Sequence, residues 1–197
     1  MRCPPRRLFL NSLQLSIHPS LKGRTVFVTG GGSGIGAAIV AAFAEQGARV
    51  AFVDIAESAS AALARQIEEA GHAAPWWRAC DVRDIAALQK AIADAAAELG
   101  DFAVLVNNVA SDDRHTLESV TPDYYDNRMA INERPALFAI QSVVPGMKRL
   151  GFGSVVNLGS TNGLRVNEAP VTRHELINGD RVEVGSTTMV FRRDDED

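Results

Sequence analysis

Short apolar runs alternate with longer amphipathic segments along the first 160 residues. The runs are rich in β-branched residues and end near glycine, asparagine or aspartate, as buried parallel strands do. The segments between them carry apolar residues at helical spacing. We predict strands over 24–29, 49–54, 74–79, 104–107 and 154–157. We predict helices over 35–46, 57–70, 84–99 and 122–150, the last interrupted near Pro135 and Pro145. This alternation predicts an α/β fold with a right-handed, doubly wound parallel sheet of about five strands.

The pattern changes after Leu158, where helical spacing disappears. Short strand-like pieces are separated by turn signals such as Asn162-Gly163 and Asn178-Gly179, which favours a β-rich, antiparallel appendage. We predict its strands over 164–166, 181–184 and 187–191. The domain division that follows is an extension over 1–20, a first domain over 21–160, a hairpin segment over 161–192 and an acidic tail over 193–197.

Composition excludes several classes of function. The chain has 197 residues and a net charge of −4, which gives no electrostatic case for nucleic acid or an anionic membrane. No apolar run approaches the roughly 20 residues of a membrane span. The basic N-terminus faintly resembles a signal peptide, but polar residues interrupt its apolar part, so we favour a plain extension. Cys3 and Cys80 fit no disulfide or metal-ligand spacing, which favours a reducing cytoplasm.

A glycine-rich turn joins the first predicted strand to the first predicted helix. It reads T-G-x-x-x-G-x-G from Thr29 to Gly36. Glycines let the backbone approach a pyrophosphate closely, and the amides at the helix N-terminus then face the negative charge. A plain glycine-rich turn is the alternative, which the flanking strand and helix disfavour. The candidate phosphate-binding residues are Gly30, Ser33, Gly34, Ile35 and Gly36.

Polar residues also lie at, or just after, the ends of the next three predicted strands. Asp54 ends the second, where a carboxylate can accept hydrogen bonds from both ribose hydroxyls of NAD and would repel the 2′-phosphate of NADP. The alternative for Asp54 is a helix N-cap or a loop acid. Asp81 and Val82 follow the third strand, and Asn107 ends the fourth. The sequence therefore predicts a Rossmann-like site for NAD, with NADP disfavoured.

With these motifs in order, residues 21–160 resemble the short-chain dehydrogenase/reductase family. The resemblance implies that Asp81 and Val82 hold the adenine end of the cofactor and that Asn107 shapes the central sheet beside it. It also implies that Asn132 is a helix-kink asparagine supporting a proton-relay water. The segment 111–115, S-D-D-R-H, is similar to that expected in sugar or polyol dehydrogenases, so the implied substrate is a small carbonyl compound or alcohol.

The resemblance stops before the family's catalytic pair. Ser160 matches its catalytic serine, but no tyrosine or lysine follows that residue. In the family the tyrosine is the general acid/base, and a lysine four residues later holds the nicotinamide ribose. His174 is a conceivable substitute, although a surface histidine is the simpler interpretation. We therefore expect an incomplete sheet with an exposed apolar edge at its fifth strand, and impaired catalysis.

Residues 155–191 resemble the C-terminal half of a forkhead-associated domain, a β-sandwich that binds phosphothreonine peptides. The pattern is L-G-S-T-N-G, then V-N, then L-x-x-G-D-x-V-x-x-G. The family's phosphate-contacting motifs have no counterpart here, so we expect no phosphopeptide binding, and plain hairpins remain the favoured interpretation. Because 157–160 fits both families, we hypothesise a chimeric gene product.

Three functions therefore stay open. The first is an NAD-dependent oxidoreductase by lineage, with a carbonyl or alcohol substrate. The second is a catalytically silent dinucleotide-binding module, and the third is an interaction protein that uses the β-rich tail. Measurable turnover would support the first function, cofactor binding without turnover the second, and peptide binding the third.

Overall fold

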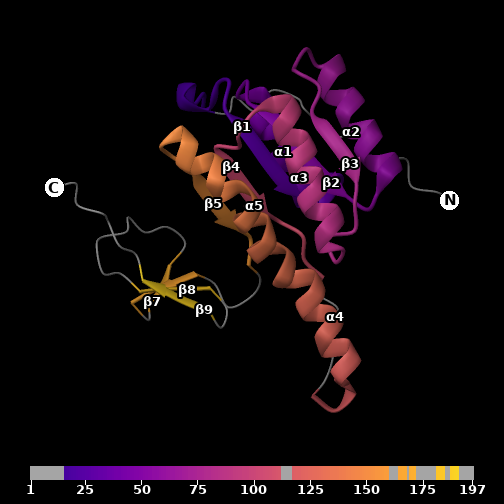
Figure 1. The fold of residues 1–197 in the computed structure, drawn as a ribbon, viewed down its shortest axis with the longest axis vertical. Helices are drawn as coiled ribbons and strands as arrows, with labels where there is room; N and C mark the ends of the chain where they lie inside the picture. Colours follow the sequence, from indigo (N-terminus) through magenta and orange to yellow (C-terminus); the bar gives the residue numbers. More distant parts are fainter. Residues whose placement is uncertain are drawn as a thin grey trace.

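A five-stranded parallel sheet forms the centre of the molecule, as the sequence predicts (Figure 1). The computed structural model describes residues 16–111, 117–159, 164–167, 169–171, 181–184 and 187–190. The strand order is β3-β2-β1-β4-β5. The order therefore reverses between β1 and β4, and the carboxyl ends on either side of that point are where doubly wound sheets bind ligands. The strands are β1 (Thr25–Thr29), β2 (Arg49–Asp54), β3 (Trp76–Ala79), β4 (Val104–Asn107) and β5 (Ser154–Asn157).

Helices cover both faces of this sheet. They are α1 (Gly34–Glu45), α2 (Glu57–Glu69), α3 (Ile85–Leu99), α4 (Pro122–Asn132) and α5 (Arg134–Leu150), with short 3-10 turns at Pro19–Leu21 and Leu117–Ser119. Residues of α1 and α2 pack on one face in a cluster that includes Val26 and Val28. Residues of α3 and α5 pack on the other, in a cluster that includes Phe27. Alternate residues of β1 thus point to opposite faces, and both faces are apolar because both are buried.

Local signals set the helix ends. The side chain of Asp84 caps α3 by accepting a hydrogen bond from the backbone N–H of Ala87 at 3.0 Å, and Gly100 ends that helix with φ of 89°. The predicted break near Pro135 lies at Glu133, which leaves Pro135 in the first turn of α5. The predicted break at Pro145 is wrong. Helix α5 continues through Pro145 because the flanking residues Val143 and Met147 are buried on its packed face.

The sheet ends at β5, and the predicted apolar edge is exposed. Every residue of β5 is exposed, including Val155 and Val156, which retain 37% and 42% of their accessible surface. Leu158, directly after the strand, is exposed as well. This strand pairs with β4 alone in the sheet, with Asn107 opposite Asn157.

Beyond β5 the described residues form a second, antiparallel sheet of order β7-β6-β8-β9, as predicted for the appendage. Its strands are β6 (Leu164–Val166), β7 (Ala169–Val171), β8 (Arg181–Val184) and β9 (Thr187–Val190). The sequence analysis missed β7, which contains Pro170. Proline lacks a backbone donor, and β7 accommodates it because it is an edge strand. In the parts of the chain that the structure describes, no helix is long and apolar enough to cross a membrane.

Candidate functional site

The glycine-rich turn follows β1 and leads directly into α1. The backbone N–H groups of Gly30 and Gly31 both donate to the carbonyl of Val53, at 2.7 and 3.2 Å, so the turn is tied to β2. A Cβ atom added at Gly36 would lie 1.8 Å from the carbonyl oxygen of Gly30. Only glycine allows the first turn of α1 to pass this close to the loop. Gly34, at the first position of α1, has φ of +55°, which also favours glycine.

The N-terminus of α1 is exposed, and its first turn carries no carboxylate that would repel an anion. Ser33 is its N-cap residue, with extended backbone, and its side chain makes no capping hydrogen bond. The first turn contains no acidic residue. Ile35 in that turn is 71% exposed, an apolar surface beside the loop. A helix start with free N–H groups and a positive dipole end is suited to an anion such as pyrophosphate.

Asp54, at the end of β2, lies against the same loop. Its residue is only 8% exposed. One carboxylate oxygen accepts a hydrogen bond from Gly32 N–H and the other from Ala56 N–H, both at 2.8 Å. The N-cap of α2 is Ala56, so Asp54 is not the helix cap that sequence allowed as an alternative. Each oxygen has used one of about two acceptor positions, which leaves room for two hydroxyl donors.

The structure places Asp81 and Val82 just beyond β3. The Asp81 side chain forms an ion pair, and the Val82 side chain is buried. The Asp81 carboxylate pairs with the Arg83 guanidinium at 2.5 Å, and hydrogen bonds from the side chain and backbone of Arg83 hold the pKa of Asp81 below its ordinary value. The side chain of Val82 is buried in the core beside Leu88. A ligand at the adenine position would therefore not meet the Val82 side chain in this arrangement.

Asn108, which sequence reasoning did not select, connects β4 to the glycine loop. Its side-chain NH₂ donates to the carbonyls of Gly30 and Thr29, at 2.9 and 3.2 Å. In return the Thr29 hydroxyl oxygen accepts from the backbone N–H groups of Asn108 and Val109. Asn108 thus ties the end of β4 to β1 and the glycine loop, and the role expected of Asn107 stays a prediction. The Asn107-Asn108 doublet was a visible signal, but which asparagine faces the loop depends on the alternation along β4.

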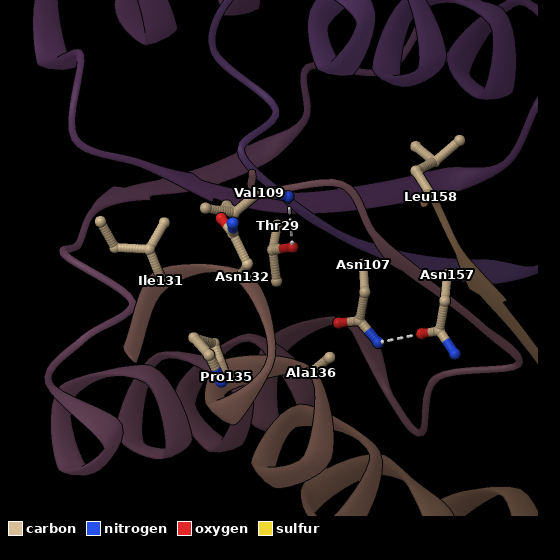
Figure 2. Close-up of a pocket in the computed structure, with 9 residues that line it drawn as sticks. All are labelled: Thr29, Asn107, Val109, Ile131, Asn132, Pro135, Ala136, Asn157 and Leu158. Carbon is tan, nitrogen blue, oxygen red and sulfur yellow. Dashed lines mark hydrogen bonds between the residues drawn. The ribbon is translucent and has the colours of Figure 1, made fainter. Parts of the chain in front are cut away.

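Asn107 faces the other side of the sheet and lines a small cavity of about 40 Å³ (Figure 2). Its side-chain NH₂ donates to Asn157 Oδ1 at 2.8 Å across the β4–β5 pair. The cavity lies between the carboxyl ends of three strands and the junction of α4 and α5. Its walls are formed by Thr29, Asn107, Val109, Ile131, Asn132, Pro135, Ala136, Asn157 and Leu158.

Asn132 ends α4 at the predicted break in the long helical stretch. Its Oδ1 accepts a hydrogen bond from Ser111 N–H at 2.7 Å, and its Nδ2 donates to the Ser111 carbonyl at 3.0 Å. The side chain therefore fastens the loop after β4 to the helix junction. Ser160 and His174, the other two residues considered for catalysis, lie outside the described residues.

Sequence comparison places the chain in a known family. Residues 24–171 match the short chain dehydrogenase family, and the chain belongs to that family. The match runs past residue 160, where the sequence analysis ended the resemblance.

Two similar proteins carry sugar dehydrogenase names. A probable galactose dehydrogenase, GalD, of Rhizobium meliloti is 49% identical over 149 residues, which are 76% of this chain and 58% of that protein. A D-xylose 1-dehydrogenase of Caulobacter vibrioides is 49% identical over 146 residues, which are 74% of this chain and 56% of that protein. This chain thus spans less than two thirds of the length of these relatives.

Solved structures agree on the fold. A short-chain dehydrogenase/reductase variant of Serratia marcescens is 35% identical with a TM-score of 0.68, covering 76% of this chain and 60% of that one. A dehydrogenase/reductase of Sinorhizobium meliloti is 34% identical with a TM-score of 0.66, covering 71% and 54%. The chain is therefore similar in sequence and in fold to oxidoreductases of one family.

Proposed function

We propose that this chain binds NAD at the carboxyl edge of its parallel sheet and is an oxidoreductase by lineage, with a sugar or polyol as the ancestral substrate. The contact of Asp54 with the glycine loop carries the proposal. A buried carboxylate with spare acceptor capacity is bonded to the glycine loop, and that loop lies so close to the first turn of α1 that a Cβ at Gly36 would lie 1.8 Å from the carbonyl oxygen of Gly30. Both features fit the adenosine ribose and pyrophosphate of a nicotinamide dinucleotide. The cofactor, when bound, supplies the hydride acceptor.

NAD is preferred to NADP in this proposal. The free acceptor positions of Asp54 accept the two ribose hydroxyls of NAD, whereas a 2′-phosphate would meet a like charge on a buried carboxylate. Exchanging hydrogen bonds for repulsion is worth about 1–3 kcal/mol, or one to two decades of affinity.

The test is a titration of the full chain with NAD⁺ and NADP⁺. We expect the unaltered chain to bind NAD⁺ about 10- to 100-fold more tightly, and Asp54→Asn to lose most of that ratio because the charge is gone. Asp101→Asn is the matched control. Asp101 lies just before β4, at the amino ends of the strands, whereas Asp54 lies at their carboxyl ends. Its neutralisation should therefore leave the ratio of NAD⁺ to NADP⁺ affinity unchanged. Equal or tighter binding of NADP⁺ by the unaltered chain contradicts the proposal.

Catalysis in this chain is proposed to be absent or nearly so. The sequence after Ser160 contains neither tyrosine nor lysine, so the family's acid/base and its ribose-holding partner are missing. Ser160 and Asn132 remain the candidate catalytic residues, and neither supplies a proton donor with a tuned pKa. A cytoplasmic location is proposed with this function, because the two cysteines of the sequence fit no disulfide or metal-ligand spacing.

A second candidate function is a non-catalytic interaction protein. The observation that favours it is the separate four-stranded sheet that contains β6 to β9.

The same organisation would arise in a chimeric gene product, in which a β-rich segment follows a dehydrogenase half. Sequencing one continuous molecule across the locus tests it, and a Tyr-x-x-x-Lys frame directly downstream of Ser160 in the gene contradicts it.

A further inference from the structure

The Asn107 side chain has one satisfied end and one unsatisfied end. Asn107 is 7% exposed. Its NH₂ group donates to Asn157, but its Oδ1 atom is buried and has no hydrogen-bond partner in the described part of the chain. Buried amide oxygens nearly always accept a hydrogen bond, because leaving one unpaired forfeits the bond it made to water. This atom therefore indicates a place for a donor.

The cavity beside Asn107 is where such a donor fits. Figure 2 shows the Asn107 oxygen directed into it and the NH₂ group directed at Asn157. Asn132, the third asparagine in the lining, uses both of its polar atoms on Ser111. About 40 Å³ exceeds the 10–15 Å³ that one water needs, so the space holds a hydroxyl or carboxamide group but no aromatic ring.

The cavity lies on the opposite side of the strand-order reversal from Asp54. Asp54 ends β2, whereas Asn107 and Asn157 end β4 and β5. A dinucleotide bound across the reversal places one nucleoside on each side. If Asp54 holds the adenosine ribose, the nicotinamide nucleoside lies towards Asn107. That half of the cofactor carries ribose O–H and carboxamide N–H donors.

We propose that Asn157 is a positioning residue, which orients the Asn107 carboxamide so that its Oδ1 accepts a hydrogen bond from the nicotinamide nucleoside of the bound cofactor. This rests on the proposed function. Asn157 needs only an acceptor for this task, because it receives the NH₂ group of Asn107. A side chain of the same size without an acceptor would release Asn107 to rotate its oxygen away from the cavity.

The experiment compares three ligands by calorimetry on the full chain: ADP, ADP-ribose and NAD⁺. ADP lacks both candidate donors, ADP-ribose adds the second ribose, and NAD⁺ adds the carboxamide. We expect Asn157→Leu to weaken NAD⁺ about five-fold, the scale of one neutral hydrogen bond, and to leave ADP unchanged. Asn157→Asp keeps an acceptor and should retain the affinity of the unaltered chain. The first ligand in the series that Asn157→Leu weakens identifies the donor as ribose or carboxamide.

Three outcomes overturn the inference. The first is an equal loss for ADP and NAD⁺ in Asn157→Leu, which indicates a general effect on the fold. The second is unchanged NAD⁺ affinity in that variant and in Asn157→Ala, which assigns the donor to water alone. The third is failure of Asn157→Asp to preserve binding. If the unaltered chain binds none of the three ligands, the proposed function fails and takes the inference with it; binding of ADP alone fails the inference only.

Discussion

Substituting Gly36 with alanine should disrupt the proposed dinucleotide site, although it adds only one methyl group to α1. Gly36 lies in the first turn of α1, and its Cα passes the glycine loop so closely that an added Cβ would lie 1.8 Å from the carbonyl oxygen of Gly30 and 2.7 Å from the side-chain nitrogen of Asn108. Real carbon–oxygen contacts are about 3.3 Å or longer. The helix or the loop must therefore shift by more than about 1 Å.

The energetic cost follows from what such a shift disturbs. Ala37 and Val40, on the same helix, are fully packed against the sheet, so α1 cannot move away freely. Overpacking of this kind costs about 1–3 kcal/mol, and the obstruction by backbone places Gly36→Ala at the upper end. Better helix propensity of alanine returns up to about 1 kcal/mol. We expect a net loss of about 2 kcal/mol, or a melting temperature lower by about 4–8 °C.

Gly146→Ala is the matched control, because it is also a glycine within a helix with close neighbours. Its nearest neighbours are side-chain atoms of Asp101, from 2.8 Å, which can rotate away. Urea unfolding and ADP titration of both variants form the assay. We expect Gly146→Ala to destabilise the chain less than Gly36→Ala does, because its close contacts are with a side chain and not with backbone, and to bind ADP normally. Unaltered stability and ADP affinity in Gly36→Ala would refute the close approach of loop and helix.

Two further predictions concern charge and chemistry. Arg149 donates two hydrogen bonds to Asp101, and these hold the pKa of Asp101 below its ordinary value of 3.8. The pair therefore stabilises the fold above pH 3.8, and its contribution is lost as the pH falls through the lowered pKa. Arg149→Met should therefore lower the stability slightly at pH 7, with a deficit that shrinks below pH 4. A constant deficit in urea titrations from pH 7 to 3 would contradict this. We also expect no reduction of NAD⁺ above a Ser160→Ala control with sugars, polyols and secondary alcohols, measured by absorbance of reduced nicotinamide; turnover above that control would make His174 the first candidate acid/base.

The parallel sheet could be predicted closely from the sequence because its signals are local. Runs such as 49–54 and 104–107 are apolar and β-branched on both faces, and their predicted bounds coincide with β2 and β4. The helix start at Asp84 followed from capping chemistry. The predicted break at Pro145 was wrong because helix propensity includes the hydrogen bond lost at proline but not the tertiary packing that keeps α5 helical.

The candidate site divides into a part that sequence could locate and a part that it could not. Gly30 to Gly36 and Asp54 are identified by their places at the ends of strands, and the structure brings Asp54 onto the loop through Gly32. That Asn108 bonds to the glycine loop while Asn107 bonds to Asn157 depends on which face each side chain takes. The Asn107–Asn157 bond depends on register between strands fifty residues apart in sequence. Such pairs become visible only when the sheet is assembled.

The two halves of the proposed cofactor site, on the β2 side and on the β5 side of the carboxyl edge, differ in how far hydrogen bonds already fix their polar groups. On the β2 side, both oxygens of Asp54 are bonded to backbone amides and the residue is buried, so an adenosine ribose would meet groups already fixed in place. On the β5 side, Asn107 retains an unpaired oxygen and the strand that orients it is exposed. Preorganised groups lose less entropy when a ligand binds. Adenosine binding should therefore withstand changes in β5 that weaken the nicotinamide half, which is why ADP serves as the reference ligand for every variant of Asn157.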